Sequence, residues 1–137
     1  MDLCTRKVIG WATSTRIDAG LACAALQAAI TLRGEPRGVI VHTDRGSVYC
    51  GWHHRNLIRC YALIPSMSGR GNCYDNAVVE SFFHSLKVES VHGVPLMHPD
   101  ALRQALFEYI EVEYNRTRRH SALGYLSPEA FEARIVA

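Results

Sequence analysis

Two carboxylates in this sequence stand where they could bind a divalent cation. Asp44 directly follows "GVIVHT", residues 38–43, a short apolar run that predicts a strand buried on both faces. Ligands of α/β sheets bind beyond the carboxyl ends of the strands, and carboxylate oxygens are the donors that Mg²⁺ prefers. Asp44 is therefore a candidate metal ligand. The alternative at this point is an ordinary Asp on a surface loop.

Glu80 is the second candidate, and 35 residues separate it from Asp44. It lies one turn into a predicted helix whose apolar residues, at helical spacing, are Val79, Phe83 and Leu86. Two acids from separate elements that meet at one sheet edge would suit two-metal phosphoryl transfer, in which cations about 3.5–4 Å apart hold the attacking and leaving oxygens. The spacing alone leaves open whether the two acids meet.

A cluster of cations lies near the C-terminus. The segment "YNRTRRH" places Arg116, Arg118, Arg119 and His120 at the end of a predicted helix. Cations stabilise that end of a helix dipole and could also contact the phosphates of a nucleic acid. A solvated helix end without a ligand is the alternative.

Three further polar residues have two readings each. Lys87 and His84 share a helix edge with Glu80, either as part of a site or as a solvated stripe. His42 precedes the predicted strand end, where it could contact a phosphate or serve only the structure. A Zn²⁺ site is a weak alternative, because its donors lack a matching second pair. Those donors would be Cys50, His53, His54, Cys60 and Cys73.

The composition predicts an intracellular globular protein. The chain has 137 residues, 48% hydrophobic and 20% charged, with a net charge of only +2. We find no stretch of membrane-span length and no signal peptide pattern. The five cysteines are odd in number and scattered, as expected for reduced thiols.

Alternating strand and helix patterns predict an α/β fold. The predicted helices are 17–32, 52–62, the Glu80 helix that begins at Asp75, 100–115 and a last one with Ser127 as N-cap and Pro128 at its first position. The predicted strands are 38–43 and 62–68, and residues 6–14 are also rich in strand-forming residues.

Three blocks in order resemble the DDE transposases of bacterial insertion sequences of the "IS three" family. They are "HTDRGSVY", "SMSGRGNCYDNAVVESFFHSLKVE" and "YIEVEYNRTRRHSALGYLSPEAFE". The resemblance implies a retroviral-integrase-type core with a ribonuclease H-like fold, a mixed sheet flanked by helices, that binds Mg²⁺ or Mn²⁺. It makes Asp44 the second and Glu80 the third acid of the DDE triad. Lys87 matches the basic position that contacts DNA near the element's end.

The chain departs from the family pattern at its N-terminus. The first Asp of the triad and the first strand would lie before Met1, and so would the family's helix-turn-helix part. We therefore expect 1–137 to form one partial catalytic core domain, with the core over about 1–115 and a helical extension over about 116–137. We expect this chain to be poorly stable alone, because neighbours of a missing central strand lose a hydrogen-bonding partner.

The resemblance implies DNA transposition by metal-dependent strand cleavage and transfer, on insertion-sequence ends and target DNA. Because the first Asp is absent, we expect the metal to bind weakly and the chain to be inactive alone. The alternative is a catalytically dead remnant that only binds DNA or joins a full-length transposase or another copy as a subunit. Either protein would be cytoplasmic and associated with the bacterial nucleoid.

Overall fold

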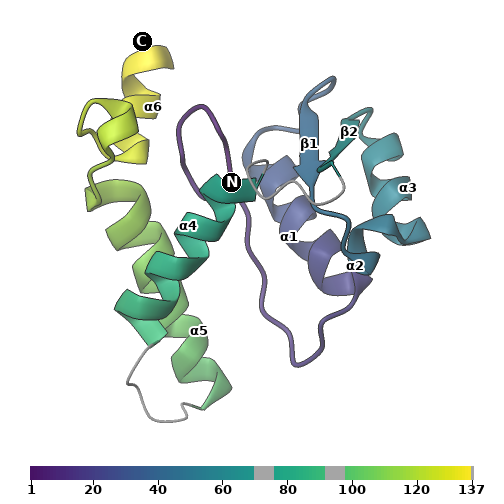
Figure 1. Cartoon of the computed structure of the whole chain (residues 1–137), viewed down its shortest axis with the longest axis horizontal. Coiled ribbons are helices and arrows are strands. Elements are labelled where there is room, and N and C mark those ends of the chain that lie inside the picture. The colour runs from purple at the N-terminus through teal and green to yellow at the C-terminus, as the bar shows by residue number, and fades with distance from the viewer. Residues whose placement is uncertain (70–75, 92–97, 137) are drawn as a thin grey trace. The chain divides into compact units, whose positions relative to one another are not determined.

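The computed structural model describes residues 1–69, 76–91 and 98–136 (Figure 1). The chain divides into two compact units. The sheet unit comprises Ile9–Ala77, and the helical unit comprises Met1–Val8 together with Val78–Ala137. The predicted boundary at about residue 115 falls inside the η3 helix of the helical unit.

The sheet unit has the predicted order of helix, strand, helix, strand. Its elements are α1 (Ala19–Leu32), β1 (Ile40–Thr43), α2 (Ser47–Cys50), α3 (Trp52–Cys60) and β2 (Ile64–Met67). The two strands pair in parallel, with Ile40 opposite Ile64 and Thr43 opposite Met67. A parallel pair needs a crossover connection, and α2 and α3 provide it. The α/β prediction and these two strands are confirmed.

Apolar side chains from α1, α3 and the strands form the core of the sheet unit. Ile30, Ile58 and Leu63 are buried, and the half-buried residues packed against them are Leu26, Val41, Leu57 and Tyr61. The segment before α1 runs close to that helix at Gly10, where a Cβ atom would lie 2.4 Å from the carbonyl oxygen of Ala25. Only glycine fits at that position.

Two expectations for the sheet are wrong in the described residues. Residues 6–14 form no strand, and the N–H and C=O groups of Val8 bond instead to the side chain of Asn115. β1 is not buried on both faces, because Ile40 is 64% exposed and Val39 is 48% exposed. Val41 packs on the core, while nothing described covers Ile40.

The helical unit consists of an N-terminal segment and a run of helices. The helices are α4 (Ala77–Leu86), η2 (Lys87–Val91), α5 (Pro99–Phe107), η3 (Glu108–Thr117), η4 (Ser121–Leu123) and α6 (Pro128–Val136). η2 and η3 are π-helical, and α6 begins as predicted, with the Ala130 N–H donating to the hydroxyl of Ser127 at 3.3 Å. Asp75, near the predicted start of α4, lies outside the described residues.

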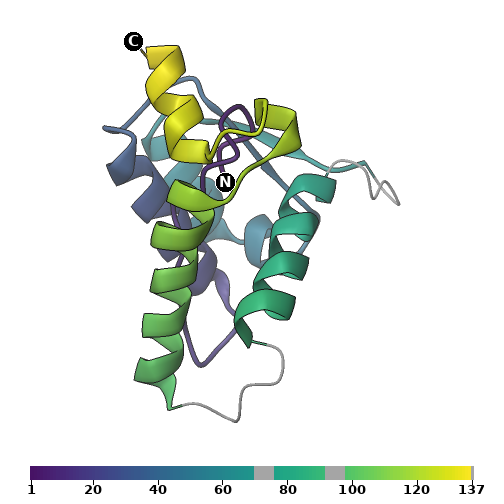
Figure 2. The ribbon, with the colours of Figure 1, turned by 90° about the vertical axis from the view of Figure 1, so that its left-hand side faces the viewer.

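The α4 helix and the continuous α5–η3 helix lie side by side in the helical unit (Figure 2). The buried ring of Phe82 packs edge-on against Tyr114 at 4.9 Å between ring centroids. Leu86 is buried as predicted, whereas Phe83 is 50% exposed. The core face of α4 therefore contains Leu86 as predicted, with Phe82 in the place predicted for Phe83.

Candidate active site

Asp44 lies directly after β1, at the carboxyl end of the parallel pair, and its side chain is exposed. Its Oδ1 accepts a hydrogen bond from the N–H of Gly46 at 2.7 Å. The other carboxylate oxygen makes no hydrogen bond or ion pair within the described residues. A Cβ atom at Gly46 would lie only 2.9 Å from Oδ1, so glycine lets the loop close on the carboxylate. This geometry leaves one oxygen of Asp44 available to a ligand.

His42 supports the strand ends beside Asp44. Its Nδ1 lies 2.9 Å from the hydroxyl of Ser66, and its Nε2 lies 3.1 Å from the hydroxyl of Ser68. Arg45 adds a bond from Nε to the carbonyl oxygen of Ser68 at 2.9 Å. Because both ring nitrogens of His42 are engaged between β1 and β2, the structural reading of this residue is favoured.

A pocket of about 480 Å³ lies between the two strands and the helices α2 and α3. Thr43, which precedes Asp44, lines it together with Tyr49 and His54. Burial raises the pKa of Tyr49, and the nearby Asp44 carboxylate adds to that rise. Burial also lowers the pKa of His54, and a hydrogen bond with the Tyr49 backbone opposes that shift in part. These two rings are therefore neutral at pH 7.

Glu80 lies in the first turn of α4, and its carboxylate is exposed. His84, one turn further, and Lys87, at the start of η2, are exposed as well. None of the three makes an ion pair within the described part of the chain. Glu80 and Lys87 belong to the helical unit, and Asp44 belongs to the sheet unit. The surroundings of each residue are therefore described within its own unit.

The four predicted DNA contacts near the C-terminus differ in their surroundings. Arg116 forms an exposed ion pair with Glu129 at 3.3 Å, and Arg118 is engaged by Glu89. Arg119 is exposed and has no ion pair among the described residues. His120 is half-buried, and its pKa is lowered first by burial and then by the charges of Arg118 and Arg6. The cluster is therefore not one continuous cationic surface.

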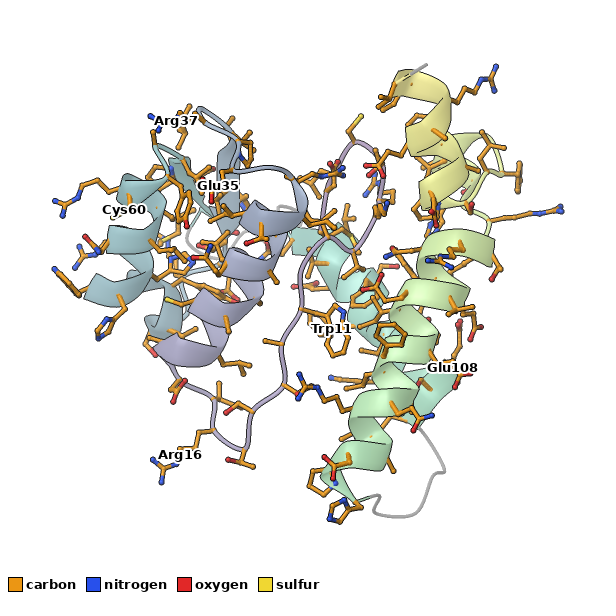
Figure 3. The ribbon with its side chains drawn as sticks, turned by 180° about the vertical axis from the view of Figure 1, so that it is seen from behind. Trp11, Arg16, Glu35, Arg37, Cys60 and Glu108 are labelled. Atoms are coloured by element: carbon orange, nitrogen blue, oxygen red, sulfur yellow. The ribbon has the colours of Figure 1, made fainter. Side chains whose placement is uncertain are left out.

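The donors proposed for zinc do not gather. No group of three or more His, Cys, Asp or Glu side chains that could hold a metal occurs in residues 1–69, 76–91 and 98–136. Cys50 and Cys60 are free thiols, and Cys60 is exposed at the end of α3 (Figure 3). Cys73 lies outside the described residues.

Sequence reasoning missed two polar residues of the helical unit. Asn115 is only 1% exposed and bonds both backbone groups of Val8, at 2.9 and 3.0 Å. Glu89 accepts a hydrogen bond from the hydroxyl of the buried Tyr109 at 2.9 Å. No spacing rule links residues so far apart; the only local signal is a polar Asn beside apolar positions of a helix.

The candidate acids have the donor chemistry of a magnesium or manganese site. Hard divalent cations prefer carboxylate oxygens, and Mg²⁺ is commonly held by one or two carboxylates with water in the other positions. The exposed side chains of Asp44 and Glu80 offer such oxygens, and neither forms an ion pair with a cation in the described ranges. The residues present therefore fit a hard divalent cation.

No described helix is long and apolar enough to cross a membrane.

Comparison with known proteins places the chain in a family. Residues 1–73 match a family described as "Integrase core domain", and residues 80–135 match a second family of the same description. The transposase InsF for insertion sequence IS3A of Escherichia coli strain K12 is 53% identical over 137 residues, which is 100% of this chain and 48% of that protein. An uncharacterized 31 kDa protein of insertion element IS600 from Shigella sonnei is 42% identical over 130 residues, which is 95% of this chain and 48% of that protein. The chain thus spans about half the length of these relatives.

Solved structures show the same fold at low sequence identity. The simian T-cell lymphotropic virus intasome, in complex with PP2A regulatory subunit B56 gamma, contains a chain similar with a TM-score of 0.64 and 18% identity, covering 86% of this chain and 41% of that one. The catalytic core domain of BIV integrase is similar with a TM-score of 0.55 and 19% identity, covering 87% of this chain and 74% of that one. Both likenesses confirm the predicted ribonuclease H-like α/β fold. The chain belongs to the integrase core domain family and, within it, to the transposases of the IS3 family of insertion sequences.

Proposed function

We propose that this chain is the part of a transposase catalytic core that carries the second and third acids of a DDE triad, Asp44 and Glu80. The observation that carries the proposal is that both carboxylates are exposed. Asp44 lies at the carboxyl end of β1 and Glu80 in the first turn of α4, each inside a segment that matches an integrase core. Within the described residues neither carboxylate forms an ion pair, so each has an oxygen that can take a ligand.

The proposed reaction has two steps at phosphodiester bonds. Water first attacks the phosphorus at the element's end, and the 3′-oxygen leaves as a free 3′-OH. That hydroxyl then attacks a phosphodiester of the target DNA, which forms the new strand joint and releases a target 3′-OH. A bound Mg²⁺ or Mn²⁺ would supply charge neutralisation at the phosphate oxygens. Asp44 and Glu80 would hold the ion through their carboxylates.

The number of acids limits what these residues do alone. A hard cation such as Mg²⁺ takes six ligands, so two carboxylates leave most positions to water, substrate or a further acid. We expect weak metal binding and little independent catalysis from the described residues. The lack of a cluster of three donors among them favours a second candidate function, a DNA-binding or subunit-association module without catalysis.

DNA is the proposed partner, both as insertion-sequence ends and as target. Lys87 and Arg119 are exposed cations without ion pairs in the described residues, and such side chains bind phosphates by releasing counterions. Association with another copy or with a longer transposase is part of the proposal, and it is supported by similarity to a chain of a viral intasome. Residues 1–137 would contribute one partial core to that assembly.

Strand transfer on a labelled element-end duplex with Mn²⁺ tests the proposal. The proteins compared are the chain as given, the same chain fused to the preceding segment of the IS3A transposase, and Asp44→Asn and Glu80→Gln forms of both. We expect joining by the fusion only, and loss of joining on either substitution. Joining that survives Glu80→Gln would overturn the assignment. Duplex binding without joining by the unsubstituted fusion would favour the module without catalysis.

A further inference from the structure

Arg118 joins two segments that lie on either side of Lys87. Its Nη1 bonds to Oε2 of Glu89, and its Nη2 lies 3.3 Å from the hydroxyl of Ser85. Ser85 belongs to α4 and Glu89 to η2, two residues before and two residues after Lys87. We call this arrangement, Arg118 bonded to both Ser85 and Glu89, the Arg118 bridge. One guanidinium therefore spans the junction between α4 and η2.

The Arg118 bridge lies at partly exposed positions and is tied to aromatic side chains of the helical unit. The side chains of Arg118 and Glu89 are 31% and 35% exposed, so water reaches part of each. Tyr109, which is buried, donates its hydroxyl to the same Glu89 oxygen at 2.9 Å, and the guanidinium lies 6.0 Å from the ring centroid of Tyr114. Arginine suits this place, because its planar fork can make two bonds at once and still face a ring.

Lys87 lies between the two residues that Arg118 contacts. Residues four apart share a face of a helix, while residues two apart do not. The side chains of Ser85 and Glu89 are both held by Arg118, so Lys87 between them is turned away and is exposed. π-Helical turns are rare and tend to occur at functional sites.

We infer that Arg118 and Glu89 are positioning residues for Lys87, and that Arg118 acts through the bridge rather than by touching DNA itself. This inference rests on the proposed function, since it assigns roles within the proposed DNA contact. It replaces the reading of Arg118 as a phosphate contact. The other cations keep their assignment, and Arg119 has no comparable acidic partner among the described residues.

The two roles for Arg118 predict opposite signs for one substitution. If Arg118 contacts phosphate directly, Glu89→Gln removes a negative charge beside it and should raise DNA affinity. If the bridge positions Lys87, Glu89→Gln breaks the anchor and should lower DNA affinity although the protein becomes more positive. The matched control is Glu129→Gln, which removes the same charge from the exposed pair with Arg116. The control should leave affinity unchanged or raise it.

The experiment measures binding of the whole chain to a fluorescent element-end duplex by anisotropy over a series of salt concentrations. The slope of log K against log salt is negative, and Lys87→Gln should reduce its magnitude by about 0.9, the value for one phosphate contact. Glu89→Gln should reduce the magnitude of the slope by a similar amount, and it should have no further effect in the Lys87→Gln background. Arg118→Lys should behave like Glu89→Gln, because a lysine keeps the charge but cannot span both partners.

The outcomes separate the inference from the proposed function. No effect of Lys87→Gln on the slope would mean that the proposed DNA contact is wrong, and the inference would fail with it. An effect of Lys87→Gln together with raised affinity in Glu89→Gln, or with unchanged affinity in Arg118→Lys, would overturn the inference alone. If thermal melting shows that Glu89→Gln is unfolded in the assay, Arg118→Lys and Ser85→Ala decide by the same comparison.

Discussion

Replacing Asn115 by alanine should cost a large part of the stability of the helical unit. The Asn115 side chain accepts from the N–H of Val8 at 2.9 Å and donates to its C=O at 3.0 Å, as a paired strand would. Val8 is 5% exposed and Asn115 is 1% exposed, so water does not reach these groups in the folded chain. The substitution leaves two buried backbone groups without a partner.

The expected magnitude follows from those two groups. A buried backbone group left unsatisfied costs about 1–3 kcal/mol, so Asn115→Ala should lower the free energy of unfolding by about 2–6 kcal/mol. The whole stability of a domain is about 5–15 kcal/mol, so the loss is a large fraction of it. Asn115→Asp should be at least as damaging, because it sets a carboxylate oxygen against the Val8 carbonyl.

Urea unfolding followed by circular dichroism measures the loss, and hydrogen exchange at the Val8 amide shows where it occurs. Thr117→Ala is the control, since it removes an exposed side-chain bond to the carbonyl of Glu113 from the same helix and should stay within about 0.5 kcal/mol. A loss below about 0.5 kcal/mol for Asn115→Ala, with protection at Val8 unchanged, would refute the reasoning.

Three further predictions concern protons and glycines. Burial lowers the pKa of His54 and of His120, so the unfolded chain takes up protons at a higher pH than the folded chain. The free energy of unfolding should therefore fall as the pH drops below about 6.5. Urea midpoints measured at pH 7.5 and at pH 5.5 should differ less once both residues are replaced by glutamine. Gly10→Ala should destabilise the sheet unit by about 1–3 kcal/mol or more in thermal or urea unfolding, because its Cβ would meet α1 backbone atoms at 2.4 and 2.5 Å; an unchanged midpoint would contradict that contact. Gly46→Ala should displace the Asp44 carboxylate and so weaken Mn²⁺ binding, measured by calorimetric titration, while the melting temperature stays nearly unchanged. An Mn²⁺ affinity equal to that of the unsubstituted chain would argue against Asp44 as a ligand.

The sequence predicted the elements that short-range interactions specify. The α1 helix begins at its cap, where Asp18 accepts from the N–H of Leu21 at 2.9 Å, and α6 begins at Ser127. Each of these bonds joins residues three apart, so the local pattern contains all the necessary information. The order of Asp44 after a strand and Glu80 early in a helix was predictable for the same reason.

Exposure along an element was less predictable, because it depends on what packs there. The run before Asp44 is apolar enough for a strand buried on both faces, yet Ile40 is exposed in the described residues. On α4 the helical spacing indicated Phe83 as a core residue, but Phe82 is the one that packs on Tyr114. Periodicity gives the kind of element, and the neighbouring elements decide which of two adjacent positions is covered.

The sequence by itself determined the fold class, the family and the two candidate acids, since each follows from local patterns and from motifs of contiguous residues. Only the tertiary structure decided the roles of the polar residues between motifs. Asn115 bonds a backbone 107 residues away, and Arg118 bonds Glu89, 29 residues away. Such pairs form only after the chain has folded back on itself, because packing of helices sets which side chains meet. For that reason the cluster near the C-terminus looked like four equivalent cations, while the folded chain engages Arg118 internally and leaves Arg119 exposed.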